Sequence, residues 1–253
     1  TNTLNGTGTL TTQGTSVVTG AINFTGGKTW VNQGTVTVGG AGSINFGYSS
    51  GGTNTLTNAA GATINLSSSA GEPLTFYTGT AIFNNAGTLN HTVSGTHSIN
   101  GNISFNNTGA VNVGVGTLSI NGSGTDTGTY SASSGAACNF GGGTRTIGAG
   151  AAVIVNGTGT VQITGGTTYV NGTVVGTGSF NVAGGTLAGT GVISSDMTLS
   201  SGSVAGTGTL TTQGTSVVTG TINLTGGKTW VNQGTLTVGG AGSINFGYSS
   251  GGT

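Results

Sequence analysis

Forty-eight residues of this chain occur twice. The segment from Gly6 to Thr53 returns as Gly206 to Thr253, 200 positions later. Three positions differ, and each exchanges one small or apolar residue for another: Ala21/Thr221, Phe24/Leu224 and Val36/Leu236. Such near-identity over this length indicates recent tandem duplication of a 200-residue unit. We therefore expect residues 1–253 to form a single continuous segment of a longer array, which continues beyond both ends.

Charged side chains are almost absent from the sequence. Among 253 residues there are three basic ones (Lys28, Arg145, Lys228) and three acidic ones (Glu72, Asp126, Asp196), whereas roughly 25% of the residues in ordinary soluble domains are charged. A protein that binds nucleic acid needs a basic surface to displace counterions from the phosphates. The composition therefore excludes nucleic acid as a partner.

The remaining composition favours strands and turns. Glycine supplies 56 residues, and apolar types still make up 33%. Glycine disfavours helices, while Thr, Val and Ile favour strands, so we expect an all-β protein. Pro73 is the single proline and Cys138 the single cysteine, which excludes collagen and an internal disulfide. No apolar run approaches the roughly 20 residues of a membrane span.

A short motif, apolar-Asn-apolar, recurs through the chain at steps of about 22 residues, as in Ile22-Asn23-Phe24 and Ile44-Asn45-Phe46. This spacing is typical of one coil of a β-solenoid. We predict a parallel β-helix of about 22 residues per coil, with about 11–12 coils in the segment. Nine coils would fill the 200-residue unit, so that each unit would restore the same face. A sandwich of hairpins is the competing architecture.

Side chains alternate between the two sides of a strand. Ile22 and Phe24 should therefore point into the coil while Asn23 points outward. Applied to each coil, this alternation predicts an outward column of asparagines on the rod: Asn23, Asn45, Asn65, Asn112, Asn181, Asn223 and Asn245.

No combination of residues predicts catalysis or a bound metal. Glu72, Asp126 and Asp196 lie 54 and 70 positions apart, whereas glycoside hydrolysis needs two carboxylates within about 5–9 Å. His91 and His97 have no acidic or cysteine neighbour to complete a metal site, so we expect them at the surface or in turns. We expect a protein that is not an enzyme, with no cofactor and no metal.

A few large side chains are candidates for contacts between rods. Lys28-Thr29-Trp30 and its copy Lys228-Thr229-Trp230 place a cation and an aromatic ring on one side of a strand. These side chains either fill a wide corner of the coil or contact a neighbouring rod or a glycan. The candidate lateral-contact residues are Lys28, Trp30, Tyr48, Tyr169, Lys228, Trp230 and Tyr248.

Pairs such as Thr35-Val36-Thr37 resemble the threonine surfaces of ice-binding solenoids. Those surfaces hold Thr-x-Thr in register on consecutive coils. Here the matching positions contain Thr, Asn, Ser and Gly, so ice binding, like a carbohydrate-active β-helix, is a lesser alternative.

The segment from Leu224 to Gly240, Leu-Thr-Gly-Gly-Lys-Thr-Trp-Val-Asn-Gln-Gly-Thr-Leu-Thr-Val-Gly-Gly, resembles the autotransporter-associated β-strand repeat and the wider filamentous-haemagglutinin-like class. The resemblance implies a right-handed parallel β-helix, export to the cell surface, and adhesive or structural roles. It brings no catalytic residues.

These observations together suggest an extracellular structural solenoid that contributes to a bacterial surface fibre, sheath or stalk. Its partners would be further copies of itself, joined end to end and side by side, and possible additional partners are glycans or host cell surfaces. The alternative is an adhesin stalk that presents a separate binding tip.

Overall fold

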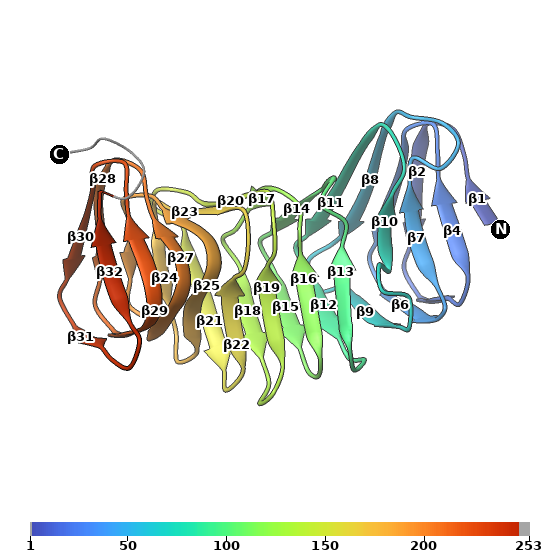
Figure 1. The fold of residues 1–253 in the computed structure, drawn as a ribbon. Helices are drawn as coiled ribbons and strands as arrows, with labels where there is room; N and C mark the ends of the chain where they lie inside the picture. The colour runs from blue at the N-terminus through green and yellow to red at the C-terminus, as the bar shows by residue number, and fades with distance from the viewer. Residues whose placement is uncertain (1, 248–253) are drawn as a thin grey trace.

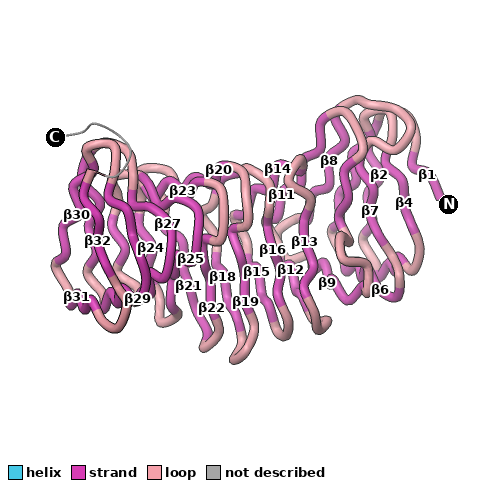
Figure 2. The backbone as a smooth tube through the Cα atoms, in the orientation of Figure 1, coloured by secondary structure: helices cyan, strands magenta, loops and turns pink. Residues whose placement is uncertain are grey.

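The computed structural model describes residues 2–247, and within them every regular element is a β-strand. The strands stack side by side along a rod, with the two ends of the chain at opposite ends (Figure 1). All strand pairs are parallel, and glycine-rich turns join them (Figure 2). The chain is a β-solenoid of about 12 coils with about 21 residues per coil, which confirms the predicted fold class.

Each coil contributes three strands, one to each of three faces that we call A, B and C. Face A holds β1 (Asn2–Leu4), β4 (Ala21–Phe24), β7 (Ser43–Phe46), β10 (Leu74–Phe76), β13 (Thr96–Ile99), β16 (Thr117–Ile120), β19 (Ala137–Phe140), β22 (Thr160–Ile163), the first parts of β25 (Ser179–Ala188), β27 (Met197–Val204) and β29 (Thr215–Leu224), and β31 (Thr235–Val238).

Face B follows in each coil. It holds β2 (Gly8–Thr12), β5 (Lys28–Asn32), β8 (Thr53–Asn58), β11 (Thr80–Asn85), β14 (Ile103–Asn107), β17 (Gly124–Thr125), β20 (Thr144–Ile147), β23 (Thr167–Val170), the second parts of β25, β27 and β29, and β32 (Ser243–Phe246).

Face C closes each coil and is one unbroken sheet. It holds β3 (Thr15–Val18), β6 (Thr35–Gly40), β9 (Thr63–Ser68), β12 (Thr88–His91), β15 (Ala110–Val113), β18 (Thr129–Ala132), β21 (Ala152–Gly157), β24 (Thr173–Val175), β26 (Val192–Ile193), β28 (Gly208–Thr212) and β30 (Lys228–Asn232).

The core is the inside of the rod, filled by alternate side chains of every strand. In β9, for example, Ile64 and Leu66 are fully buried, whereas Thr63 and Asn65 are half-buried on the outer side. Aromatic rings of successive coils stack inside: the ring centroids of Phe83 and Phe105 lie 5.0 Å apart. Glycine lets the turns of neighbouring coils approach closely. A Cβ atom at Gly34 would lie 2.2 Å from the carbonyl oxygen of Gly14 in the coil below.

The second copy of the repeated segment lies one face further round the rod than the first. β2 and β5 lie on face B, while their sequence equivalents β28 and β30 lie on face C. From β2 to β28 the chain passes 26 labelled strands, and β25 and β27 each cover two faces. The copies are therefore 28 strand positions, or nine and one third coils, apart. The expectation that a unit makes nine whole coils and restores the same face is wrong.

The physical reason is that the apolar-Asn-apolar motif is not confined to one face. Asn45 lies on β7 of face A, and the next motif, around Asn65, lies on β9 of face C. The 20 residues between them are therefore not one coil. Any strand with one buried side fits this motif, whichever face it lies on. The number of motif steps therefore does not equal the number of coils.

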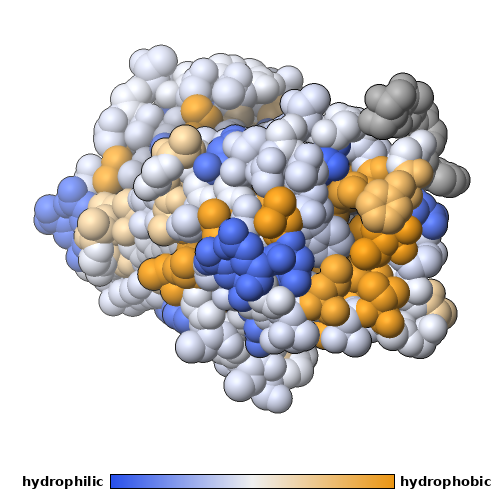
Figure 3. All heavy atoms as spheres, turned by 90° about the vertical axis from the view of Figure 1, so that its left-hand side faces the viewer, coloured by the Kyte–Doolittle hydropathy of each residue, from blue (hydrophilic) through white to orange (hydrophobic). Residues whose placement is uncertain are grey.

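The same sequence is buried in one copy and open in the other. Val38 and Phe46 are covered by Leu66 of β9 and Phe76 of β10, and both are fully buried. Their equivalents Val238 and Phe246, in the last described coil, are 50% and 77% exposed. Figure 3 looks at this end of the rod, where apolar groups surround a polar group. Burial of a coil therefore depends on the next coil that stacks on it.

Candidate functional site

The Lys-Thr-Trp strands point their largest side chains into the rod. Trp30 is 4% exposed, packs on Phe24 with ring centroids 5.8 Å apart, and donates from Nε1 to Thr12 Oγ1 at 3.0 Å. Trp230 makes the same bond to Thr212, also at 3.0 Å. Both indoles therefore fill the coil, and their assignment as lateral-contact residues is wrong.

The two lysines lie on the same inner side, two residues before each tryptophan. Lys228 is 6% exposed, and its Nζ donates to the carbonyl oxygens of Gly189 and, at 3.2 Å, Thr207. Burial lowers the pKa of Lys228. Lys28 is half-buried. The Lys228 ammonium therefore binds carbonyl oxygens of the rod itself instead of a neighbouring rod.

Two of the predicted contact residues do lie at the surface. Tyr48 is 41% and Tyr169 42% exposed. Tyr48 makes an edge-to-face pair with Tyr77, which is 53% exposed and which the sequence analysis missed. Tyr248 lies outside the described residues. The rod therefore retains an exposed tyrosine pair at one corner and a separate tyrosine on face B.

The seven predicted asparagines do not form one column. Asn23, Asn45 and Asn181 lie on face A, Asn65 and Asn112 on face C, and Asn223 and Asn245 on face B. Short ladders join neighbours, with Nδ2 to Oδ1 distances of 2.9 Å from Asn45 to Asn23 and 3.2 Å from Asn245 to Asn223. Moreover, Asn23 and Asn45 are 1% and 5% exposed, so these two side chains are not accessible.

A longer asparagine ladder runs inside the rod, along the end of face B. Asn32, Asn58, Asn85 and Asn107 are 0–1% exposed. Each Nδ2 of the first three donates to the Oδ1 of the next, at 2.9, 2.8 and 2.8 Å. The same groups also bind backbone carbonyl oxygens, such as that of Thr88. Because buried amides are costly unless they are bonded, this ladder fixes the register of four consecutive coils.

The sequence contains a signal for this ladder that differs from the apolar-Asn-apolar motif. Asn32 and Asn85 are each followed by x-Gly-Thr, and Asn107 by Thr-Gly-Ala. The glycine turns the chain towards face C, and the asparagine side chain reaches back over that turn: Asn32 Nδ2 donates to Gly34 O at 3.2 Å. The signal is incomplete, because Asn58 is followed by Ala-Ala-Gly, whereas Asn45 and Asn139, outside this ladder, also precede x-Gly.

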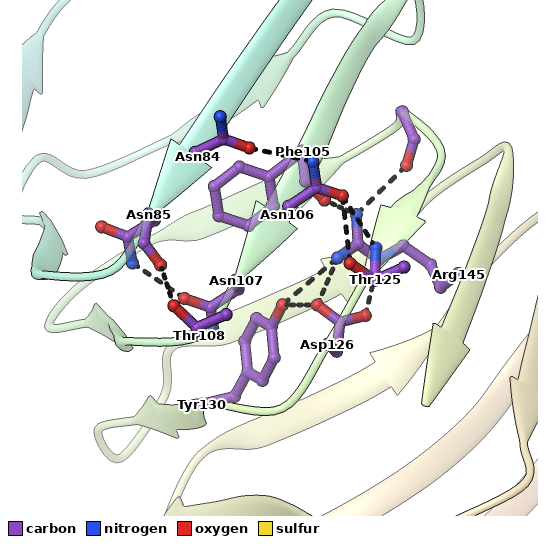
Figure 4. A network of polar contacts seen from close by, with 11 residues as sticks. Asn84, Asn85, Phe105, Asn106, Asn107, Thr108, Thr125, Asp126, Tyr130 and Arg145 are labelled. Carbon is purple, nitrogen blue, oxygen red and sulfur yellow. Dashed lines mark hydrogen bonds and ion pairs between the residues drawn. The ribbon is translucent and has the colours of Figure 1, made fainter. Parts of the chain in front are cut away.

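An ion pair replaces the amide at the next step of this row. Asp126 pairs in register with Asn107 and accepts hydrogen bonds from Arg145, whose Nε lies 3.0 Å from Asp126 Oδ2. Tyr130 also donates to Asp126, and the Arg145 guanidinium lies 5.4 Å from the ring centroids of Phe105 and Phe140. Figure 4 shows this network between neighbouring coils.

The environment of this ion pair shifts the pKa of the groups around it. Burial alone would lower the pKa of Arg145, but the Asp126 carboxylate, Tyr130 and Cys138 together raise it. Burial raises the pKa of Tyr130 well above its usual value, and that of the nearby Cys138 thiol to about 12. A thiol with so high a pKa is a poor nucleophile. The cluster joins the inner asparagine row to the apolar coils that follow.

A pair of histidines is buried where face C turns into face A. His91 is fully buried and His97 is 5% exposed, and His91 Nε2 lies 3.1 Å from His97 Nδ1. His91 Nδ1 donates to the carbonyl oxygen of Val115 at 3.0 Å. Burial, and then the neighbouring His97, lower the pKa of His91. The expectation that these residues lie at the surface is wrong.

The three carboxylates do not converge. Asp126 is buried in its ion pair, Glu72 accepts from Asn100 Nδ2 at 3.0 Å, and Asp196 accepts from the backbone of Thr215 at 2.8 Å. Within residues 2–247, no group of three or more His, Cys, Asp or Glu side chains could hold a metal ion. Nor does that part of the chain contain a helix long and apolar enough to cross a membrane.

Comparison of the chain with protein-family models, with curated proteins and with solved structures gave no match.

Proposed function

We propose that this chain is a structural segment of an extracellular surface fibre, sheath or stalk, of the kind that bacterial autotransporter-like passengers form. The observation that carries the proposal is the stacking of the coils. Phe46, in the first copy, is fully buried by the coil above it, and the identical Phe246 is 77% exposed without one. Each added coil thus buries the end of the preceding one, so length is stabilising.

The outer faces support lateral association between such rods. Most outward side chains are Thr, Ser and Asn, and Arg145 and Lys228 are turned inward. A surface with so little charge repels a second copy weakly. The exposed Tyr48–Tyr77 pair and Tyr169 are large side chains available for contacts with a neighbouring rod, as are exposed apolar residues such as Val115 and Ile154.

Electron microscopy of the purified full-length protein tests this proposal. We expect rods whose length grows with the number of 200-residue units, and bundles that persist at high salt because few charges hold them. Short, monomeric particles whose length does not depend on unit number would contradict it. A full-length gene with a distinct terminal head would instead support the adhesin stalk.

A further inference from the structure

Face C carries a regular column of threonines on its outer side. Strand pairing places these outward residues in register over the first six coils: Thr15, Thr35, Thr63, Thr88, Ala110 and Thr129. Five of the six are threonine. All are exposed or half-buried, and the inward residues next to them, such as Ile64 and Leu89, are fully buried.

A second column runs beside the first, two residues further along each strand. It consists of Val17, Thr37, Asn65, Asn90, Asn112 and Ser131. Its amides are bonded into a ladder: Asn90 Nδ2 donates to Asn65 Oδ1 at 2.9 Å, and Asn112 Nδ2 to Asn90 Oδ1 at 3.0 Å. These bonds hold the side chains in one orientation from coil to coil.

The two columns form a lattice with fixed spacings. Neighbouring strands lie about 4.8 Å apart, and residues i and i+2 of a strand about 6.6 Å apart. Threonine is β-branched, so its χ1 angle is restricted, and its hydroxyl and methyl groups repeat along the column with little freedom. The surface therefore presents an ordered two-dimensional array of hydroxyl, methyl and amide groups.

Charge excludes several ligands for this array and favours one. The strands from β3 to β18 on face C present no Asp, Glu, Lys or Arg, and the one ionisable imidazole among them, His91, points inward. No aromatic ring lies on the outer side to stack against sugars, because Tyr130 is buried. The ligand that fits this array is a neutral surface that repeats in two dimensions at similar spacings. Such a surface needs no aromatic ring to stack against it.

We propose that face C of the first six coils binds ice. An ice surface is uncharged and repeats water oxygens in two directions, so a rigid array of hydroxyl, methyl and amide groups can share ordered water with it. Each contact is weak, but many contacts form together and their effects combine. The proposal does not depend on the fibre function, since one rod would present the array alone.

The test is the growth of ice in the presence of the purified chain. We expect thermal hysteresis that rises with protein concentration, together with shaped crystals. Thr63→Tyr and Thr88→Tyr, each in the middle of the array, should abolish most of the hysteresis, because the ring holds the face away from the ice. Thr57→Tyr is the matched control, since Thr57 lies outward on face B in the coil of Thr63.

Circular dichroism establishes that each variant folds, and Thr63→Lys replaces any tyrosine variant that does not. Normal, unshaped growth of ice with the unmodified chain would overturn the proposal. So would equal loss of hysteresis in Thr57→Tyr and Thr63→Tyr. Retention on insoluble cellulose or chitin without any effect on ice would assign the array to a polysaccharide instead.

Discussion

The inner asparagine ladder gives the sharpest prediction about stability. In Asn58→Ala, three short hydrogen bonds disappear: those of Nδ2 to Asn85 Oδ1 and Thr88 O, and that from Asn32 Nδ2. A long contact of Nδ2 with Ala62 O at 3.5 Å is lost as well. Asn85 Oδ1 then lacks its ladder partner in a fully buried site. One orphaned acceptor at about 2 kcal/mol and two further lost bonds at about 1 kcal/mol each predict a loss of about 4 kcal/mol in the free energy of unfolding.

Asn65→Ala is the matched control on the outer side of face C. Asn65 is half-buried, accepts a bond from Asn90 at 2.9 Å and donates a weak one to Thr37 Oγ1 at 3.4 Å, and water can replace both. We expect this substitution to lower the free energy of unfolding by about 1 kcal/mol or less. Both variants are compared by urea unfolding followed by circular dichroism, with amide hydrogen exchange to locate the coils that open first. Equal losses in the two variants, or a loss below about 1 kcal/mol in Asn58→Ala, would refute the distinction between inner and outer ladders.

Three further perturbations probe the interior. Because the pKa of His91 is lowered in the folded chain, the unfolded state binds the proton more readily, so the melting temperature should fall as the pH drops below about 6.5. The substitution His91→Leu should remove this dependence. A melting temperature that does not change between pH 5 and 7.5 would contradict the prediction. The substitution Arg145→Ala leaves the Asp126 carboxylate buried without its partner. It should lower the free energy of unfolding, measured by urea titration, by about 3–5 kcal/mol. A loss below about 1 kcal/mol would show that the carboxylate is solvated. The substitution Gly34→Ala should lower the melting temperature, because the new Cβ would meet the Gly14 carbonyl oxygen. In Gly14→Ala the new Cβ meets nothing within 4 Å, so the melting temperature should equal that of the unmodified chain. Equal effects of the two substitutions would contradict the close approach of the coils.

The solenoid could be predicted from the sequence because its cause is local. Strand alternation and glycine turns act over a few residues, so the period near 21 residues is visible in the chain itself. The face on which each strand lies could not be predicted in this way. It depends on how many corners the chain has turned, and β17, with two residues, and β25, which covers two faces, escape a motif count.

Polar residues inside the rod were missed for a different reason. An asparagine or arginine in an alternating strand is normally assigned to the solvent side. Yet alternation places Arg145 on the same side as Ile147, and both are buried. Strand alternation therefore predicts the inward side chains better than polarity does. The partners of the inner asparagines and of Arg145 lie in the adjacent coil, 19 to 27 positions away in sequence. Partners at that distance are visible only when the coils are placed in register.

The shift of one face per unit has a geometric consequence for any array of such units. Nine and one third coils advance the rod by about 45 Å and turn the repeated segment by about a third of a revolution. Successive units are then related by a threefold screw axis, and 600 residues return the sequence to its starting side. An identical patch therefore points in three directions along one rod. Such a rod would meet neighbours on all sides through the same residues, which favours a trigonal bundle over a flat ribbon.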